Sequence, residues 1–191
     1  MTAPSGARGL VLFIAASAIL AAIVHLVVVL VTPVVASGDA YARLAPLGKL
    51  NETVALPRAD PGDHMLPDAD PAVAMAFCRY DLGAGPIRVR APIGRAFSSI
   101  SFHSPRGPAF YALTDRAGAR GAIEAVLGTP DDVRALAAHD DEESPTRDLR
   151  IAAPEREGYV MIRVFSELPS LYPEAEADAK RLTCAPEPAP R

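Results

Sequence analysis

The longest apolar stretch of the chain lies close to its first residue. Residues 10–31 read LVLFIAASAILAAIVHLVVVLV, with no charge and with Ser17 and His25 as polar interruptions. At 1.5 Å per residue, such a helix is roughly 33 Å long, enough to cross a hydrocarbon layer of about 30 Å. A helix inside a soluble protein rarely stays apolar on every face over this length. The pattern predicts a transmembrane anchor within residues 1–36, with Pro33 as its stop.

A cleaved signal peptide is the competing interpretation of this segment. Small residues precede Ser37, where a cleavage site needs them, but a signal peptide's apolar core runs about 7–15 residues and this run is longer. Arg8 precedes the run, while Asp39 and Arg43 follow it. The positive-inside rule then favours a cytoplasmic N-terminus, which places the rest of the chain on the other side of the membrane.

After the apolar run comes a segment rich in Pro, Gly and Asp, and after it come stretches in which apolar and polar residues alternate. Residues 37–71 include RADPGDHMLPDADP and are predicted to be a spacer of turns and extended chain. Residues 87–91 alternate apolar and charged side chains, as in a half-buried strand. Residues 96–103 place Ile100 and Phe102 on one face, a turn is expected at 104–107, and residues 109–115 form the return strand. Further strands are predicted at 122–127, 148–153 and 158–167.

Two short helices interrupt these strands. Thr129 is a candidate N-cap before Pro130 and two acids, which predicts a helix that ends near residue 138. A second helix is predicted over residues 173–182, with acids in its first turn and a Glu176–Lys180 pair. The expected fold is mainly β (α+β): an antiparallel, β-sandwich-like domain over residues 72–184 with two short helices, followed by a disordered tail at 185–191.

Composition and charge exclude several classes of protein. The 191 residues carry a net charge of -4, which argues against a nucleic-acid binder, and two cysteines are too few for a zinc module. The histidines have no metal-ligand spacing and no glycine-rich phosphate loop is present, so neither a metal nor a cofactor is expected. His103 lies among several serines, but without a G-x-S-x-G elbow no catalytic residue is predicted.

Two stretches resemble a known family. They are AFCRYDLGAGPIRVRAPI and AFSSISFHSPRGPAFYALTDR. The chain resembles the domain of unknown function 1254 family in its short, membrane-anchored form from Gram-negative bacteria. The residues that carry the resemblance are Cys78, Arg79, Tyr80, Asp81, Leu82, Gly85, Pro86, Phe110, Tyr111, Leu113, Asp115 and Arg116. The resemblance implies a β-rich envelope domain, anchored in the bacterial inner membrane, with a companion protein of the domain of unknown function 1214 family and with no established reaction.

The two cysteines are the most specific chemical feature. In an oxidising compartment Cys78 and Cys184 are expected to form a disulfide, and the alternative is two separate buried thiols. A possible binding surface of arginines and tyrosines is formed by Arg79, Tyr80, Arg88, Arg90, Tyr111 and Arg116. The ordinary polar side of a β-sheet is the alternative interpretation of these six residues.

Three functions follow from these observations. The first is a non-enzymatic periplasmic domain that is tethered by one N-terminal span and binds a companion envelope protein. The second is a lipid- or glycan-binding envelope module, which a deep apolar pocket between the sheets would favour. The third is a membrane-bound hydrolase, which needs a serine, a histidine and an acid within hydrogen-bonding reach.

Overall fold

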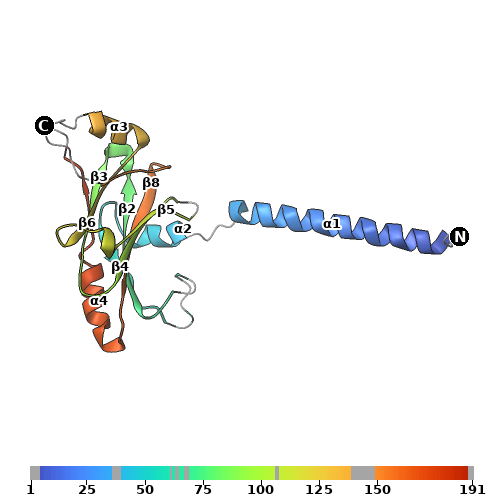
Figure 1. Cartoon of the computed structure of the whole chain (residues 1–191), viewed down its shortest axis with the longest axis horizontal. Helices are drawn as coiled ribbons and strands as arrows, with labels where there is room; N and C mark the ends of the chain where they lie inside the picture. The colour runs from blue at the N-terminus through green and yellow to red at the C-terminus, as the bar shows by residue number, and fades with distance from the viewer. Residues whose placement is uncertain are drawn as a thin grey trace. The chain divides into compact units, whose positions relative to one another are not determined.

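The computed structural model describes residues 5–35, 40–60, 62, 65–66, 69–105, 108–138 and 149–188. The chain divides into two compact units, Met1–Gly38 and Asp39–Arg191. The first unit contains the helix α1 (Ser5–Val35), whose stretch Gly6–Thr32 is long and apolar enough to cross a membrane and buries none of its surface in the protein. The helix begins before the predicted Leu10 and continues two residues past Pro33 (Figure 1). The predicted cleavage point beside Ser37 lies outside the described residues.

The second unit is built from two sheets. The five-stranded sheet has the order β1 (Thr53–Ala55), β2 (Val73–Asp81), β8 (Glu157–Phe165), β4 (Ser98–His103) and β5 (Ala109–Thr114), and all its neighbouring pairs are antiparallel. The four-stranded sheet has the order β7 (Leu149–Ala152), β6 (Ala122–Gly128), β3 (Ile87–Pro92) and β9 (Thr183–Pro186).

Short helices complete the unit. They are α2 (Ala40–Leu44), α3 (Pro130–Ala138), α4 (Tyr172–Ala179) and the single 3-10 turns η1 (Ala45–Leu47), η2 (Leu82–Ala84), η3 (Asp115–Ala117) and η4 (Pro169–Leu171). The helices α3 and α4 lie at opposite ends of the unit (Figure 1). Thr129 Oγ1 accepts the backbone N–H of Asp132, and the Asp132 carboxylate accepts the N–H of Thr129, so the predicted N-cap of α3 is present.

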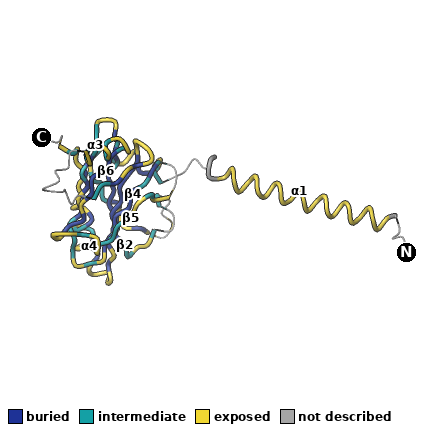
Figure 2. Tube along the Cα trace, turned by 45° about the horizontal axis from the view of Figure 1, so that its top comes forward, coloured by how far each residue is buried: buried dark blue, intermediate teal, exposed yellow. Residues whose placement is uncertain are grey.

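The main core fills the space between the sheets. Alternate residues of β2, β8 and β4 face those of β3 and β6 there, and α4 closes one end. Val160, Ile162 and Val164 on β8 are at most 2% exposed, so this β-branched face of the strand points into the core. The dark interior of Figure 2 contrasts with α1, which is exposed along its described length.

Most of the predicted strands and both predicted helices are confirmed, but one strand pair differs. The strand β7 joins β6 in parallel, because the connection between them contains α3 and is long enough for a crossover. The turn expected at residues 104–107 falls partly on residues outside the described part of the chain, although the β4–β5 hairpin itself is formed. The mainly β (α+β) fold is therefore confirmed with one parallel pair added.

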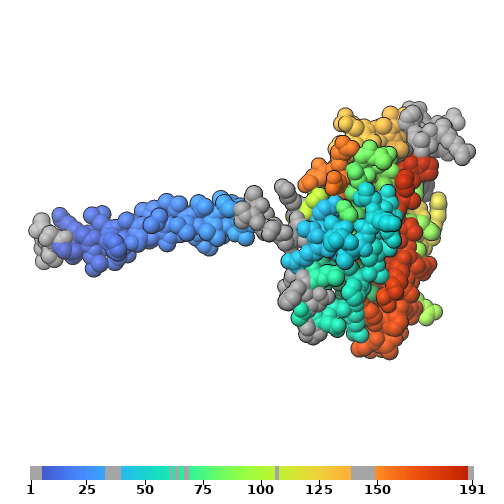
Figure 3. All heavy atoms as spheres, turned by 180° about the vertical axis from the view of Figure 1, so that it is seen from behind, coloured from blue at the N-terminus to red at the C-terminus, as the bar shows by residue number. Residues whose placement is uncertain are grey.

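Two segments predicted as loops belong to the folded unit. Within the predicted spacer 37–71, β1 forms an edge strand of the five-stranded sheet and α2 packs on that sheet, and Leu44 and Leu56 are buried. In Figure 3 this segment, light blue to cyan, forms part of the surface of the second unit. In the predicted tail, β9 pairs with β3, and the N–H of Glu187 donates to the carbonyl of Pro86. Backbone hydrogen bonds and apolar burial thus order both segments.

Candidate functional site

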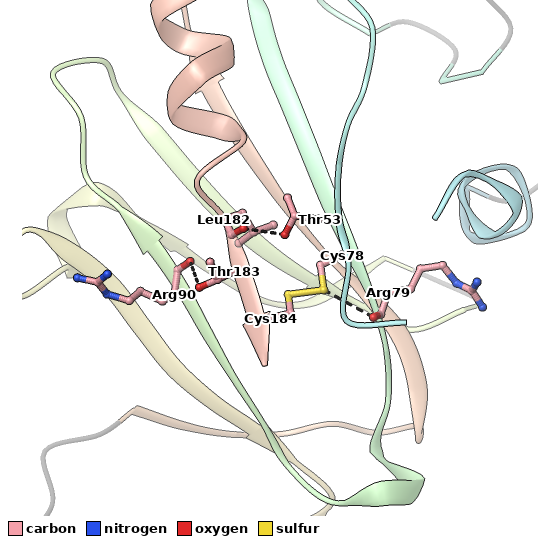
Figure 4. The surroundings of a disulfide bond; sticks show 7 residues. All are labelled: Thr53, Cys78, Arg79, Arg90, Leu182, Thr183 and Cys184. Carbon is pink, nitrogen blue, oxygen red and sulfur yellow. Dashed lines mark hydrogen bonds between the residues drawn. A yellow bond between two sulfur atoms is a disulfide. The ribbon is translucent and has the colours of Figure 1, made fainter. Parts of the chain in front are cut away.

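A disulfide joins the two sheets. Cys78 on β2 and Cys184 on β9 are bonded to one another, their Cα atoms are 6.5 Å apart, and 106 positions separate them in the sequence (Figure 4). Thr53 Oγ1 donates to the carbonyl of Leu182 over 2.7 Å beside this bridge. The predicted pairing is therefore confirmed. The disulfide attaches β9, and with it the preceding helix α4, to the five-stranded sheet.

Arg79, the first of the six predicted surface residues, holds the N-terminal part of the folded unit. Its guanidinium donates to the carbonyls of Ala45 and Gly48 over 2.9 and 3.4 Å, and to the hydroxyl of Tyr41. The guanidinium carbon also lies 5.4 Å from the centre of the Tyr41 ring. Through these contacts Arg79 connects β2 to α2 and η1.

Tyr80 was predicted on the surface, and this prediction is wrong. The side chain is 0% exposed because β2 directs it into the space between the sheets. Its hydroxyl donates to the carbonyl of His103 over 3.2 Å. Burial raises the pKa of the Tyr80 hydroxyl, and Glu155 and Tyr41 raise it further.

The other four predicted residues do not form one surface. Arg88 makes a two-point ion pair with Glu187, with N–O distances of 2.8 and 2.7 Å, and Arg90 pairs with Glu124 across the four-stranded sheet. Tyr111 lies on the edge strand β5 and Arg116 on η3. Figure 4 shows the side chains of Arg79 and Arg90 pointing away from one another on either side of the disulfide. The two sheets therefore separate the residues that the sequence suggested as a group.

A polar cluster on the outer face of the five-stranded sheet joins His103 and one of its neighbouring serines, which the sequence indicated, to Tyr159 and Arg163, which it did not. Ser101 Oγ is 2.9 Å from His103 Nε2 and accepts a hydrogen bond from Arg163 Nη1 over 2.8 Å. The rings of His103 and Tyr159 stack with centroids 4.5 Å apart and planes 3° apart. Arg163 lies within the strand predicted at 158–167 and was not predicted as a site residue. The signal that could have found it is the alternation of β8, which points its side chain away from the core face of Val160, Ile162 and Val164.

The electrostatics of this polar cluster keep its histidine neutral. Burial, and then the positive charge of Arg163, lower the pKa of His103 to about 4. Burial also lowers the pKa of Arg163, while Tyr159 opposes that change. A hydrolytic serine needs a histidine that is oriented by an acid. Among the residues that the structure describes, no carboxylate forms a hydrogen bond with His103, so the cluster is an incomplete triad.

An open pocket of about 430 Å³ adjoins the polar cluster, and we call it the outer pocket. Arg163 and Tyr159 form part of its wall. The rest of its lining is mainly apolar and consists of Ala40, Leu66, Ala69, Asp70, Val73, Met75 and Met161. A pocket of this size with a few polar groups is typical of a small-molecule site.

A second surface feature is an apolar patch formed by Phe97, Phe165, Leu168 and Leu171. These side chains are 52%, 40%, 57% and 42% exposed. The carbonyl of Phe97 accepts the N–H of Phe165, and the N–H of Leu171 donates to the carbonyl of Leu168. Phe165 and Leu171 also line a shallow pocket of about 170 Å³ with Arg95, Glu167 and Glu174 around it. An apolar centre with a charged rim is typical of protein interfaces.

The described part of the chain contains no group of three or more histidine, cysteine, aspartate or glutamate side chains that could hold a metal ion. Of the histidines considered at the sequence level, His64 and His139 lie outside the described residues.

Two solved structures resemble the chain. The VPA0106 protein from Vibrio parahaemolyticus matches with a TM-score of 0.52 and 14% identity, over 80% of this chain and 38% of that one. An uncharacterised protein from Burkholderia cenocepacia matches with a TM-score of 0.44 and 15% identity, over 79% of this chain and 42% of that one. The chain thus spans about two fifths of the length of the structures it matches. The first match supports the fold alone.

Residues 50–186 match the model of a family described as "Protein of unknown function (DUF1254)". The matched region runs from just before β1 to the end of β9 and includes both cysteines. No curated protein matches the chain.

Proposed function

This chain belongs to the DUF1254 family, and from that membership and the geometry of the folded unit we propose that it is a membrane-tethered binding domain and not an enzyme. Its partner is a companion envelope protein, and the apolar patch is the surface that binds it. The observation that carries this proposal is the group of four large apolar side chains that the folded unit leaves exposed.

The tether and the compartment are supported by different parts of the chain. The apolar helix α1 is long enough to cross a bilayer and is unpacked within the protein, which supports an anchor and equally fits a signal sequence. The Cys78–Cys184 disulfide supports an oxidising compartment, because disulfides rarely persist in a reducing cytosol. We therefore assign the folded unit to the periplasm and the N-terminus of α1 to the cytoplasm.

The lengths of the solved neighbours support a companion protein. In the Vibrio parahaemolyticus structure the region that matches this chain accounts for 38% of the polypeptide, so the fold occurs there beside a larger additional region. A companion protein that contributes a surface of that kind would cover the apolar patch of this chain.

Site-specific crosslinking in the native bacterium tests the proposal. A photoreactive amino acid at Phe165 or Leu168 is expected to give one discrete crosslinked product of higher mass. The same group at Glu124, an exposed position on β6, serves as the control. The double variant Phe97→Ser/Leu168→Ser should abolish capture from position 165 without altering the near-ultraviolet circular dichroism of the tyrosines. Equal products from positions 165 and 124, or none from either, would contradict the assignment.

The other two functions receive less support. The main core fills the space between the sheets, so a lipid pocket at that place is not favoured. The polar cluster supplies a serine and a histidine, and among the described residues no acid is bonded to that histidine as hydrolysis would require.

A further inference from the structure

The outer pocket carries an inference that is independent of the apolar patch. The two features have no lining residue in common. We propose that the outer pocket binds the carboxylate end of a single long acyl chain, with Arg163 holding the carboxylate and the methionine-lined wall holding the first part of the chain.

Arg163 provides the charge that such a ligand requires. Its side chain is half-buried beside apolar residues, and an arginine keeps its positive charge there because its pKa in water is far above neutral. Within the described residues no carboxylate forms an ion pair with Arg163, whose Nη1 donates a hydrogen bond to Ser101 Oγ. A guanidinium has five N–H donors, so donors remain for a carboxylate.

The wall of the outer pocket suits a flexible hydrocarbon. Met75 and Met161 lie on the outer face of β2 and β8, and Val73 and Leu66 pack against them. Methionine side chains adapt to irregular apolar ligands because they are unbranched and polarisable. Tyr159 closes the wall next to Arg163, with an apolar ring that is fixed by its stacking on His103.

The charges around the outer pocket favour a monoanion. One arginine faces the pocket, and the neighbouring His103 is neutral at pH 7 because burial and Arg163 lower its pKa to about 4. Asp70 also lines the pocket, where its carboxylate accepts the N–H of Ala72 over 2.8 Å. Arg163 is the one cation in the described lining, so it can compensate one negative charge, and a fatty-acid carboxylate fits better than a phosphate with two charges.

Photolabelling of the full chain in a nonionic detergent tests this inference. The probe is a hexadecanoic acid with a diazirine group on its chain, and the reporter is the tryptic peptide of residues 59–79, which contains most of the wall. Label on α1, which any micelle-dissolved acyl chain can reach, provides the internal reference. Unlabelled hexadecanoate is expected to lower the ratio of label on 59–79 to label on α1 about tenfold, and hexadecan-1-ol is expected to leave it unchanged.

Three variants test whether the labelling depends on the positive charge of Arg163 and not on the folding of the protein. Arg163→Gln should lower the labelling ratio about tenfold, Arg163→Lys should retain part of it, and Arg90→Gln, which removes an arginine from the other sheet, should leave it unchanged. Unchanged tyrosine circular dichroism confirms that each variant is folded. Equal competition by the acid and the alcohol in the unmodified protein would overturn the inference, as would label confined to α1. Stronger competition by lysophosphatidate than by hexadecanoate would overturn the choice of a carboxylate.

Discussion

The bridge between Cys78 and Cys184 should account for a large part of the stability of the folded unit. It closes a loop of 106 positions that includes β3 to β8, and in the chain-entropy model such a loop lowers the unfolded-state entropy by an amount worth about 4–5 kcal/mol at 25 °C. Domains of this size are stable by about 5–15 kcal/mol, so reduction removes a substantial fraction. The reduced thiols would remain buried as small apolar groups, and packing should change little.

The tyrosines allow this loss to be measured on the full chain. All five lie between residues 41 and 172 and α1 has none, so tyrosine fluorescence reports the folded unit even when α1 stays helical in detergent. Urea unfolding with and without reductant should differ in midpoint by about 2 M, given a slope of about 2 kcal/mol per M. The reduced protein should still fold in the absence of urea.

A double variant separates loop closure from other effects of the reductant. Cys78→Ala/Cys184→Ala should unfold near the midpoint of the reduced protein and should not respond to reductant. A midpoint shift of less than about 0.3 M on reduction of the native cysteines would refute the reasoning, because it would leave no measurable contribution from the closed loop. A double variant as stable as the oxidised protein would refute it independently.

Three further predictions concern the five-stranded sheet. Gly158→Ala should destabilise the unit by about 2–4 kcal/mol in the same urea assay, since the added Cβ would overlap the carbonyl of His103 and the hydroxyl of Tyr80; a loss below about 0.5 kcal/mol would contradict this packing. Because the folded state holds the pKa of His103 at about 4 while the unfolded state has about 6.5, the unfolded state binds more protons between these values, so stability should fall as the pH drops from about 6.5 to about 4. The loss should reach about 1–2 kcal/mol after allowance for partial exposure, and His103→Gln should remove that part of the pH dependence. Arg79→Met should free the segment around α2 and speed tryptic cleavage at Lys49 severalfold, whereas Arg90→Met should not.

The sequence predicted elements well where local chemistry decides the structure. Alternation located β3, β4 and β8, and the Thr129 cap located α3, because these signals depend on neighbours within a few residues. The Cys78–Cys184 pair could be proposed because the chain has two cysteines and so one possible bridge.

What the sequence missed depends on contacts between distant segments. The spacer and the tail are rich in Pro and polar residues, yet Leu44 and Glu187 find partners on the sheets far along the chain. The prediction of a binding surface from six arginines and tyrosines was wrong for the same reason. Sequence proximity does not reveal that β2 and β3 belong to different sheets, and β2 buries both faces under α2 and the core, so its alternation gave no sign that Tyr80 points inward.

The position of the bridge also determines when the folded unit can be locked. Cys184 lies in β9, the last strand along the chain, and its partner Cys78 lies in β2, the second strand. During synthesis Cys78 therefore has no cysteine of its own chain to pair with until six further strands have followed it. An enzyme that oxidises cysteines in the order in which they emerge would find no partner for Cys78 before then, so the bond must form late. By that time β8, which pairs with both β2 and β4, has already been made. The disulfide can therefore form only in a chain that already contains every strand of both sheets.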